Sequence, residues 1–188
     1  MKILRIVLFL SLTSPFLQAQ KKTDQQTLTW IRYYNIFPLT EKWSIHTELD
    51  NRSFVNPIHE NLFVVRVQGR YRANKTIDLG CGFAYFNVNT QDPRIDPNFS
   101  VPEYRGQQDI TLINDIAKIT FHNRFQIEER FMQKASRTEL LDDFSFSWRF
   151  RYRLQSTFTL WEKDKRNLKG TISDEILLNY GKDNKRNM

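Results

Sequence analysis

One segment, Phe144 to Leu154, alternates two kinds of side chain without exception. Its sequence is FSFSWRFRYRL, so every even-numbered position carries an aromatic ring or a leucine and every odd-numbered position carries serine or arginine. A period of two places the apolar groups on one face of a β-strand and the polar groups on the other. A helix would scatter the arginines around its circumference, because its period is about 3.6 residues. The segment is therefore predicted to be a two-faced strand.

The same alternation recurs along most of the chain, so the fold class is predicted to be all-β. Turn-forming residues such as Pro38 and Asn74–Lys75 separate the alternating runs. We expect about eight strands, at residues 27–37, 42–52, 61–72, 76–88, 103–113, 118–131, 144–161 and 168–180. Asn114–Asp115 is the predicted turn before the sixth strand, and residues 133–142 form a charged connection before the seventh. The pattern predicts one antiparallel up-and-down β-barrel without a domain linker.

Residues 1–19 have the composition of a secretory signal peptide. Lys2 and Arg5 make the start positive, residues 6–17 are mostly apolar, and Ala19 is a small residue before a cleavage site. The apolar run is shorter than the roughly 20 residues that a transmembrane helix needs. We therefore expect a signal peptide at 1–19 that is removed on export, followed by one β-barrel domain at 20–188.

Charge, cysteine and histidine content narrow the possible partners. The formal net charge is +7, and it falls to +5 when Lys2 and Arg5 are removed with the signal peptide. The arginines alternate singly with apolar residues instead of gathering on a helix, so no nucleic-acid partner is expected. Cys81 is the only cysteine, which excludes an internal disulfide and a cysteine metal cluster. The three histidines lack metal-ligand spacing, and no cofactor is expected.

Alternation alone is compatible with two opposite kinds of barrel. A soluble barrel hides its aromatic face, whereas a transmembrane barrel turns that face to lipid and keeps the polar face in its lumen. Long strands, which can cross a bilayer when tilted, favour the membrane. So do rings near strand ends, where interfacial girdles lie. These rings belong to Trp30, Trp43, Tyr71, Tyr85, Tyr152, Trp161 and Tyr180.

Long side chains of opposite charge share the polar face of these strands. The predicted members of a polar network in the lumen are Glu48, Asp50, Arg66, Arg70, Arg124, Glu128, Arg130, Arg149, Arg151 and Glu175. Such groups can pair across a narrow lumen, where an unpaired charge would be costly. A ring of arginines around a water-filled bore would favour anions. A small barrel favours the other interpretation, in which salt bridges fill and stiffen the interior.

Four motifs in order resemble a known family. They are Pro102–Arg105 followed by Gln108, Arg124–Phe131, Arg149–Tyr152, and Ser173–Glu175 with Asn179–Gly181. Over nearly all of the mature chain the sequence is similar to the domain of unknown function 2490 family, predicted outer-membrane β-barrels found largely in Bacteroidetes. One motif departs from the family, which has a tryptophan where this chain has Gln107. The resemblance implies an outer-membrane barrel and no assigned activity.

The end of the sequence also departs from that family. The family continues past the last motif with an Asn-Arg-containing strand and further hairpins, whereas this chain stops at Asp183–Met188. Outer-membrane barrels usually finish on an aromatic residue that the assembly machinery reads. An open barrel would leave unpaired strand edges in lipid, where such edges do not occur. We therefore expect an incomplete barrel that lacks C-terminal strands.

Three functions are compatible with these features. The first is a non-enzymatic outer-membrane β-barrel, structural or transport-related, whose partners are outer-membrane lipid and the barrel-assembly machinery. The second is a secreted or periplasmic soluble β-barrel that binds a small apolar ligand.

The third is a barrel-embedded lipid hydrolase built on Ser44, His46 and Glu48, which share one strand face and have the chemistry of an acyl-transfer triad. Neighbours on one face lie about 6.6 Å apart, so we expect no direct hydrogen bond between these side chains. The chain also lacks a Gly-x-Ser-x-Gly motif.

Overall fold

The computed structural model describes residues 25–89, 94, 99–136, 139–163 and 166–181. These residues form eight strands: β1 (Leu28–Pro38), β2 (Trp43–Phe54), β3 (His59–Arg72), β4 (Ile77–Val88), β5 (Val101–Ile116), β6 (Ile119–Ala135), β7 (Leu140–Lys163) and β8 (Arg166–Tyr180). Within the described residues, no helix has the length and apolar character that crossing a membrane requires. The predicted signal peptide at 1–19 and the chain end at Asp183–Met188 lie outside them.

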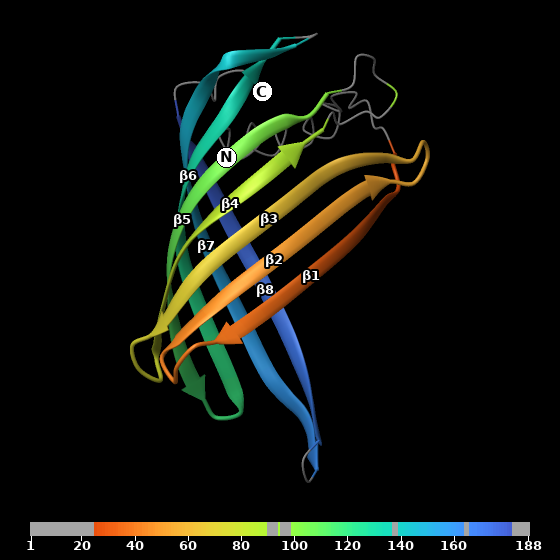
Figure 1. The fold of residues 1–188 in the computed structure, drawn as a ribbon. Coiled ribbons are helices and arrows are strands. Elements are labelled where there is room, and N and C mark those ends of the chain that lie inside the picture. Colours follow the sequence, from red (N-terminus) through yellow and green to blue (C-terminus); the bar gives the residue numbers. More distant parts are fainter. Residues whose placement is uncertain (1–24, 90–93, 95–98, 137–138, 164–165, 182–188) are drawn as a thin grey trace, which may run out of the picture.

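All eight strands belong to one sheet, in the order β1 to β8, and each pairs antiparallel with the next in sequence. The sheet curls into an open half-barrel whose free edges are β1 and β8 (Figure 1). In the part of the chain that the structure describes, no backbone ladder joins these two edges. The predicted all-β, up-and-down fold is confirmed, and its open form is consistent with an incomplete barrel.

Two predicted connections are wrong, because strand pairing continues through them. The predicted turn at Asn114–Asp115 lies inside β5, where the Thr120 hydroxyl donates a hydrogen bond to Asp115 Oδ1 across the hairpin at 2.6 Å. The predicted connection at 133–142 shrinks to 136–139, because β6 and β7 continue to pair from both sides. Polar side chains at strand ends do not stop a ladder that satisfies the backbone donors and acceptors.

The sheet is apolar on its convex face and polar on its concave face. On β7, Phe146 and Phe150 are more than 40% exposed on the convex face, while the Arg149 and Arg151 side chains point inward and are about four-fifths buried. The largest fully buried side chains are two carboxylates, Glu103 and Glu128. Among the described residues the buried apolar cluster is small, with Val64, Ala84 and Phe86 as its members. The half-barrel therefore has a charged interior in place of a hydrophobic core.

β1 follows a different pattern from the other strands. Trp30 and Tyr34 share the concave face with Arg32, which forms an ion pair with Glu48 of β2. The predicted place of Trp30 in an outward girdle is therefore wrong. The Arg32–Glu48 ion pair places the even-numbered residues of β1 on the concave face. Ile31 and Tyr33, which are 68% and 59% exposed, occupy the other face.

Two polar residues of β6, Asn123 and Glu129, interrupt the convex face. The Tyr152 hydroxyl of β7 donates to Asn123 Oδ1 at 2.8 Å, so that this amide has a partner on the same face. Glu129 lies over Gly106 of β5, where a Cβ atom would come within 2.6 Å of its carboxylate. The absence of a side chain at Gly106 gives the carboxylate its space.

Gly82 of β4 lies where two strands approach closely on the inner side of the sheet. A Cβ atom added there would lie 2.7 Å from the Cα atom of Gln68 and closer still to the carbonyl oxygen of Val67. Since both neighbours are backbone, the strands would have to separate. We expect Gly82→Ala to lower the free energy of unfolding by about 1–3 kcal/mol, as overpacking does.

Gly69 supplies the matched control for that measurement. A Cβ atom at Gly69 would meet its nearest atom, the carbonyl oxygen of Cys81, at 3.8 Å, which is ordinary contact. In a urea titration followed by tryptophan fluorescence, Gly69→Ala should leave the midpoint close to that of the wild type. Equal midpoints for Gly82→Ala and the wild type would contradict the close approach.

Candidate functional site: the charged concave face

The concave face encloses a cavity of about 740 Å³, open to solvent and lined by side chains of β1 to β7. Counted over the described residues, eleven arginines line it: Arg32, Arg52, Arg66, Arg70, Arg72, Arg105, Arg124, Arg130, Arg149, Arg151 and Arg153. Seven carboxylates line the same space or bind these arginines: Glu48, Asp50, Asp78, Glu103, Asp109, Glu128 and Glu175. With neutral histidines, the face therefore has an excess of four positive charges.

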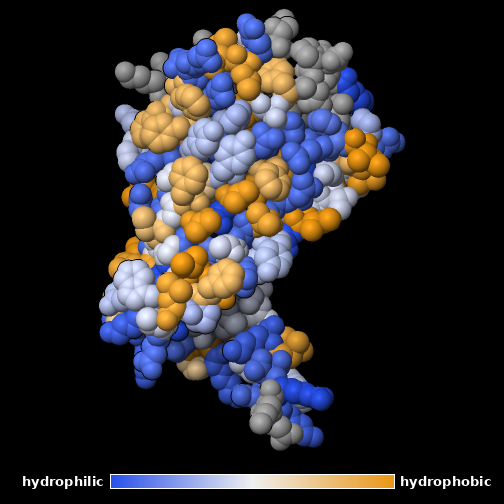
Figure 2. Space-filling model, in the orientation of Figure 1, coloured by the Kyte–Doolittle hydropathy of each residue, from blue (hydrophilic) through white to orange (hydrophobic). Residues whose placement is uncertain are grey.

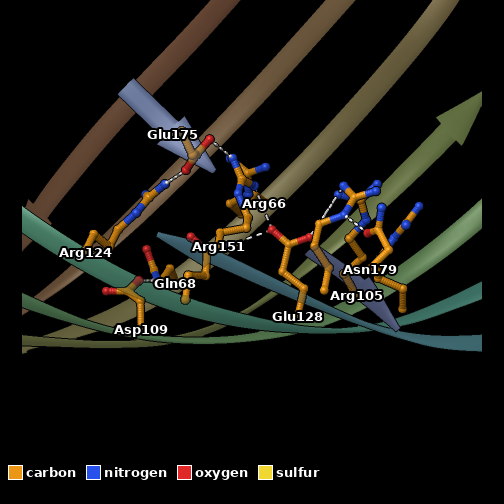
Figure 3. A network of polar contacts seen from close by, with 12 residues as sticks. Arg66, Gln68, Arg105, Asp109, Arg124, Glu128, Arg151, Glu175 and Asn179 are labelled. Atoms are coloured by element: carbon orange, nitrogen blue, oxygen red, sulfur yellow. Dashed lines mark hydrogen bonds and ion pairs between the residues drawn. The ribbon is translucent and has the colours of Figure 1, made fainter. Parts of the chain in front are cut away.

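Glu128 is the most connected carboxylate of this face (Figure 3). It is 1% exposed and accepts hydrogen bonds from Arg105 at 3.2 Å, Gln126 at 2.8 Å and Arg151 at 2.7 Å. Arg149 lies 3.9 Å away. Three strands, β5, β6 and β7, thus meet at one buried carboxylate, and its removal would take one acid partner each from Arg105 and Arg151.

Glu103 and Arg105 of β5 continue this network. Arg105 donates two hydrogen bonds to Glu103, at 2.9 and 2.8 Å, and Arg130 of β6 donates a third. The guanidinium carbon of Arg105 also lies 3.6 Å from the ring centroid of Phe86. A planar guanidinium can combine two-point carboxylate binding with stacking on an aromatic ring. Arg105 therefore links the charged network to the small apolar cluster on β3 and β4.

A second group of contacts joins β3 to β5 across β4. Arg70 donates to both carboxylate oxygens of Asp109 at 3.2 Å, and Gln68 donates to Asp109 at 2.6 Å. Arg70 also binds Asp78, at 2.9 Å. Gly80 of β4 lies between these partners, and a Cβ atom there would come within 2.6 Å of both Gln68 and Asp109. The missing side chain is what lets two non-adjacent strands meet.

The two edges of the sheet are each held by one carboxylate. On β2, Glu48 accepts from Arg32 of β1 and from Arg66 of β3, both at 2.7 Å. On β8, Glu175 accepts from Arg124 of β6 at 3.0 Å and from Arg151 of β7 at 2.6 Å. Glu48 thus ties the edge strand β1 to β3, and Glu175 ties the edge strand β8 to β6 and β7.

All ten residues predicted for the polar network lie on the concave face. Seven of them are the members of three clusters: Arg66 binds Glu48, Arg124 and Arg151 bind Glu175, and Arg149 and Arg151 lie within 4 Å of Glu128. Of the remaining pairs, Arg130 binds Glu103, Arg70 binds Asp109, and Asp50 binds Arg52 at 3.4 Å. Sequence reasoning missed Glu103, Arg105 and Asp109. The sequence feature that could have identified them is the run of polar residues at the odd-numbered positions of β5.

The geometry at Ser44 and His46 corrects one expectation. Ser44 Oγ lies 3.0 Å from His46 Nε2, so these neighbours do hydrogen-bond although they are two residues apart on one strand. The other ring nitrogen of His46 contacts the Tyr34 hydroxyl. Glu48, the expected acid of a triad, is held by Arg32 and Arg66 instead. The structure therefore assembles a serine–histidine–tyrosine chain here.

Metal-ligating residues do not cluster in the described parts of the chain. No group of three or more histidine, cysteine, aspartate or glutamate side chains there is placed to hold a metal ion. The carboxylates of the concave face have arginines as their partners, as described above. The guanidinium N–H donors of this face suit anions better than cations.

Comparison with family models gives one match, described as "Protein of unknown function (DUF2490)", over residues 27–188. The chain belongs to this family. The predicted resemblance is thereby confirmed, whereas comparisons with curated proteins and with solved structures find no match. The four motifs that carry the resemblance fall on consecutive strands, β5 to β8. Their charged members, among them Arg105, Glu128, Arg151 and Glu175, form the central network of Figure 3.

Proposed function

We propose that the protein is an outer-membrane β-barrel protein, structural or transport-related, whose charged concave face forms the lumen. The observation that carries the proposal is the orientation of the two faces: rings and aliphatic groups point outward, and ion-paired arginines point inward. In water this arrangement would be unfavourable, because burial of apolar area is the main driving force of folding. In lipid it is the arrangement that transmembrane barrels adopt.

Several ring pairs on the convex face support the proposal because they lie near one end or the other of their strands, although Phe125 and Tyr152 pair midway along theirs. Trp43 and Tyr71 lie 4.7 Å apart near the turns that connect β1 to β2 and β3 to β4. Toward the opposite ends of their strands, Tyr85 and Tyr104 lie 5.4 Å apart, and Phe131 and Phe146 lie 4.9 Å apart. Aromatic girdles at both interfaces are a feature of outer-membrane barrels.

An apolar groove of about 440 Å³ crosses the convex face between the ring pairs near the strand ends. Its outward-facing side chains come from β5 to β8 and are mainly aliphatic or aromatic: Gln108, Ile110, Phe125, Ile127, Phe150, Tyr152, Ile176 and Leu178. A groove with so little polar surface suits an acyl chain. The described ends of β7 and β8 next to their connection, by contrast, extend beyond the neighbouring strands (Figure 1). Their last residues, Glu162, Lys163, Arg166 and Asn167, are polar or charged, and the described surface there is mainly hydrophilic (Figure 2), as in a segment that reaches into water.

The soluble alternative, a barrel that binds a small apolar ligand, needs an apolar interior. The interior of this half-barrel carries arginine and carboxylate side chains, and its apolar groove lies on the convex side. The hydrolase alternative keeps a serine–histidine contact at Ser44 and His46, while its expected carboxylate is occupied elsewhere. The membrane proposal gives a role to the charged concave face, as the lumen, and to the apolar convex face, as the surface in contact with lipid.

The single cysteine provides a direct test. Cys81 is exposed on the convex face of β4, in the same cross-strand row as Gln108 and Ile127. We expect a membrane-impermeant, hydrophilic maleimide to leave Cys81 unmodified in intact outer-membrane fragments, because lipid covers it, and to modify it completely after denaturation.

The matched control moves the thiol to a turn. In a Cys81→Ser, Lys75→Cys variant the cysteine lies in the exposed β3–β4 connection, outside the apolar band, and should react without denaturation. Equally fast modification of both proteins before denaturation would overturn the proposal, as would release of the protein from the membrane pellet by a carbonate wash.

A further inference from the structure

The concave face has more hydrogen-bond donors than acceptors. Among the described residues, five arginine Nε atoms are buried without a partner, on Arg52, Arg66, Arg124, Arg151 and Arg153. One buried acceptor, Asp50 Oδ1, is also unpartnered. An unpartnered buried donor costs free energy, so an excess of such donors indicates an acceptor-rich ligand. The excess of four positive charges on this face indicates that such a ligand is an anion.

Three of these donors lie together on β6 and β7. Arg153 is directly opposite Arg124 in the strand register, and Arg151 is the next inward-facing residue on the same strand. Glu175 is the acid directly opposite Arg153 on β8, yet its two oxygens are taken by Arg124 and Arg151. Arg153 itself has no ion pair or hydrogen bond in the described part of the chain. Like charges directly opposite each other are destabilising.

We propose that Arg124, Arg151 and Arg153 form a binding site for a soluble oxyanion of the phosphate class, either inorganic phosphate or the phosphate group of a small ester. Guanidinium groups match phosphate oxygens with paired N–H donors. An anion in the cavity would accept from the guanidinium groups of these three arginines and relieve the repulsion between Arg124 and Arg153. His122, two residues from Arg124 and on the same side of β6, also lines the cavity.

The identity of the ligand follows from the position of the site. The three arginines face the solvent-filled cavity of about 740 Å³, whereas lipid would contact the convex face. A soluble anion can reach this cavity, which has the volume for a small phosphorylated molecule. The proposal rests on the proposed function for the route by which solutes reach the concave face, but binding itself requires only the folded sheet.

Calorimetry on the detergent-solubilised protein at constant ionic strength tests the proposal, with inorganic phosphate and glycerol phosphate as ligands and chloride as the reference anion. We expect phosphate to bind and Arg153→Gln to weaken that binding about 10- to 100-fold, the loss that follows removal of a charged hydrogen-bonding group. Arg153→Lys should give an intermediate loss, because it keeps the charge without the planar fork. Tighter binding of the ester would identify a phosphorylated solute as the ligand, and equal binding would identify phosphate itself.

Arg72→Gln is the matched control, because it removes the same charge from the rim of the same cavity. Arg72 is 62% exposed and lies 3.9 Å from its nearest carboxylate, so its loss should change phosphate affinity by less than about threefold. In phosphate-free buffer Arg153→Gln should unfold at the same urea concentration as wild type or a higher one, since it removes an unpaired charge. A purely structural role for Arg153 would lower that midpoint.

Two results would overturn the inference. One is wild-type protein that binds neither phosphate nor the ester any better than chloride. The other is an Arg153→Gln variant that is folded, as judged by its circular dichroism spectrum, and binds phosphate as tightly as Arg72→Gln does. Both are measured in detergent solution, so they are independent of whether Cys81 is shielded in membranes. Failure of the membrane proposal and failure of the anion site can thus be told apart.

Discussion

Replacement of Glu128 by leucine is expected to lower the free energy of unfolding by about 3–5 kcal/mol, the cost of removing one partner from a buried ion pair. Glu128 is 1% exposed and accepts hydrogen bonds from Arg105 and Arg151. Without it, Arg105 would keep only Glu103 and Arg151 only Glu175 as acid partners, and both guanidinium groups would still bear their desolvation cost. Arg149, which lies 3.9 Å from this carboxylate, would add to the repulsion.

The measurement is a urea titration of the folded protein in detergent, followed by tryptophan fluorescence. Asp143→Asn is the matched control, because Asp143 forms a 2.6 Å ion pair with Lys134 in which both side chains are exposed. Exposed pairs contribute little to stability, so the control should unfold close to the wild-type midpoint. If Glu128→Leu unfolded at the same urea concentration as Asp143→Asn, the ion-pair network around Glu128 would contribute nothing measurable to the free energy of unfolding, and the prediction would be wrong.

The strands were predictable because alternation is a local property of the sequence. On β7 every large apolar residue from Phe144 to Leu154 has the parity of the convex face, and the structure places the strand at residues 140–163. β5 was predicted as a strand, but its network members were missed. Its convex face mixes Tyr104 and Ile110 with Gly106 and Gln108, so the contrast between its two faces is weak.

Partner choice was not predictable, because it depends on how the sheet curves. Arg70 and Asp109 lie on strands that are not neighbours, and they meet because Gly80 leaves the intervening strand without a side chain. The Ser44–His46 contact depends on side-chain conformations that bring two groups together across a spacing of one strand repeat. In β1, rings occur on both faces, so only the partner of Arg32 reveals which face is concave. The alternation of the sequence thus predicts which face of the sheet each side chain occupies, whereas the curvature of the sheet determines which side chains on the concave face form ion pairs.

The orientation of the faces has its strongest consequence at Ile127, where a charge should block membrane assembly. Ile127 is 39% exposed in the apolar groove of the convex face, midway along β6 and between the ring pairs near the strand ends. An arginine facing lipid near the bilayer midplane costs about 2–4 kcal/mol in outer-membrane barrels. We expect Ile127→Arg to reduce the folded fraction in phospholipid vesicles and to shift the folding transition to lower urea.

The matched control is Ile58→Arg, which places the same charge in the β2–β3 connection at a residue that is 90% exposed. A turn residue outside the apolar band meets water or lipid headgroups, so this variant should fold into vesicles as the wild type does. The two variants also separate the membrane proposal from the soluble one by the sign of the effect. On a soluble protein, an arginine in place of exposed Ile127 would remove apolar surface from water and be neutral or favourable. A selective loss of vesicle folding by Ile127→Arg requires that lipid, and not water, covers the convex face.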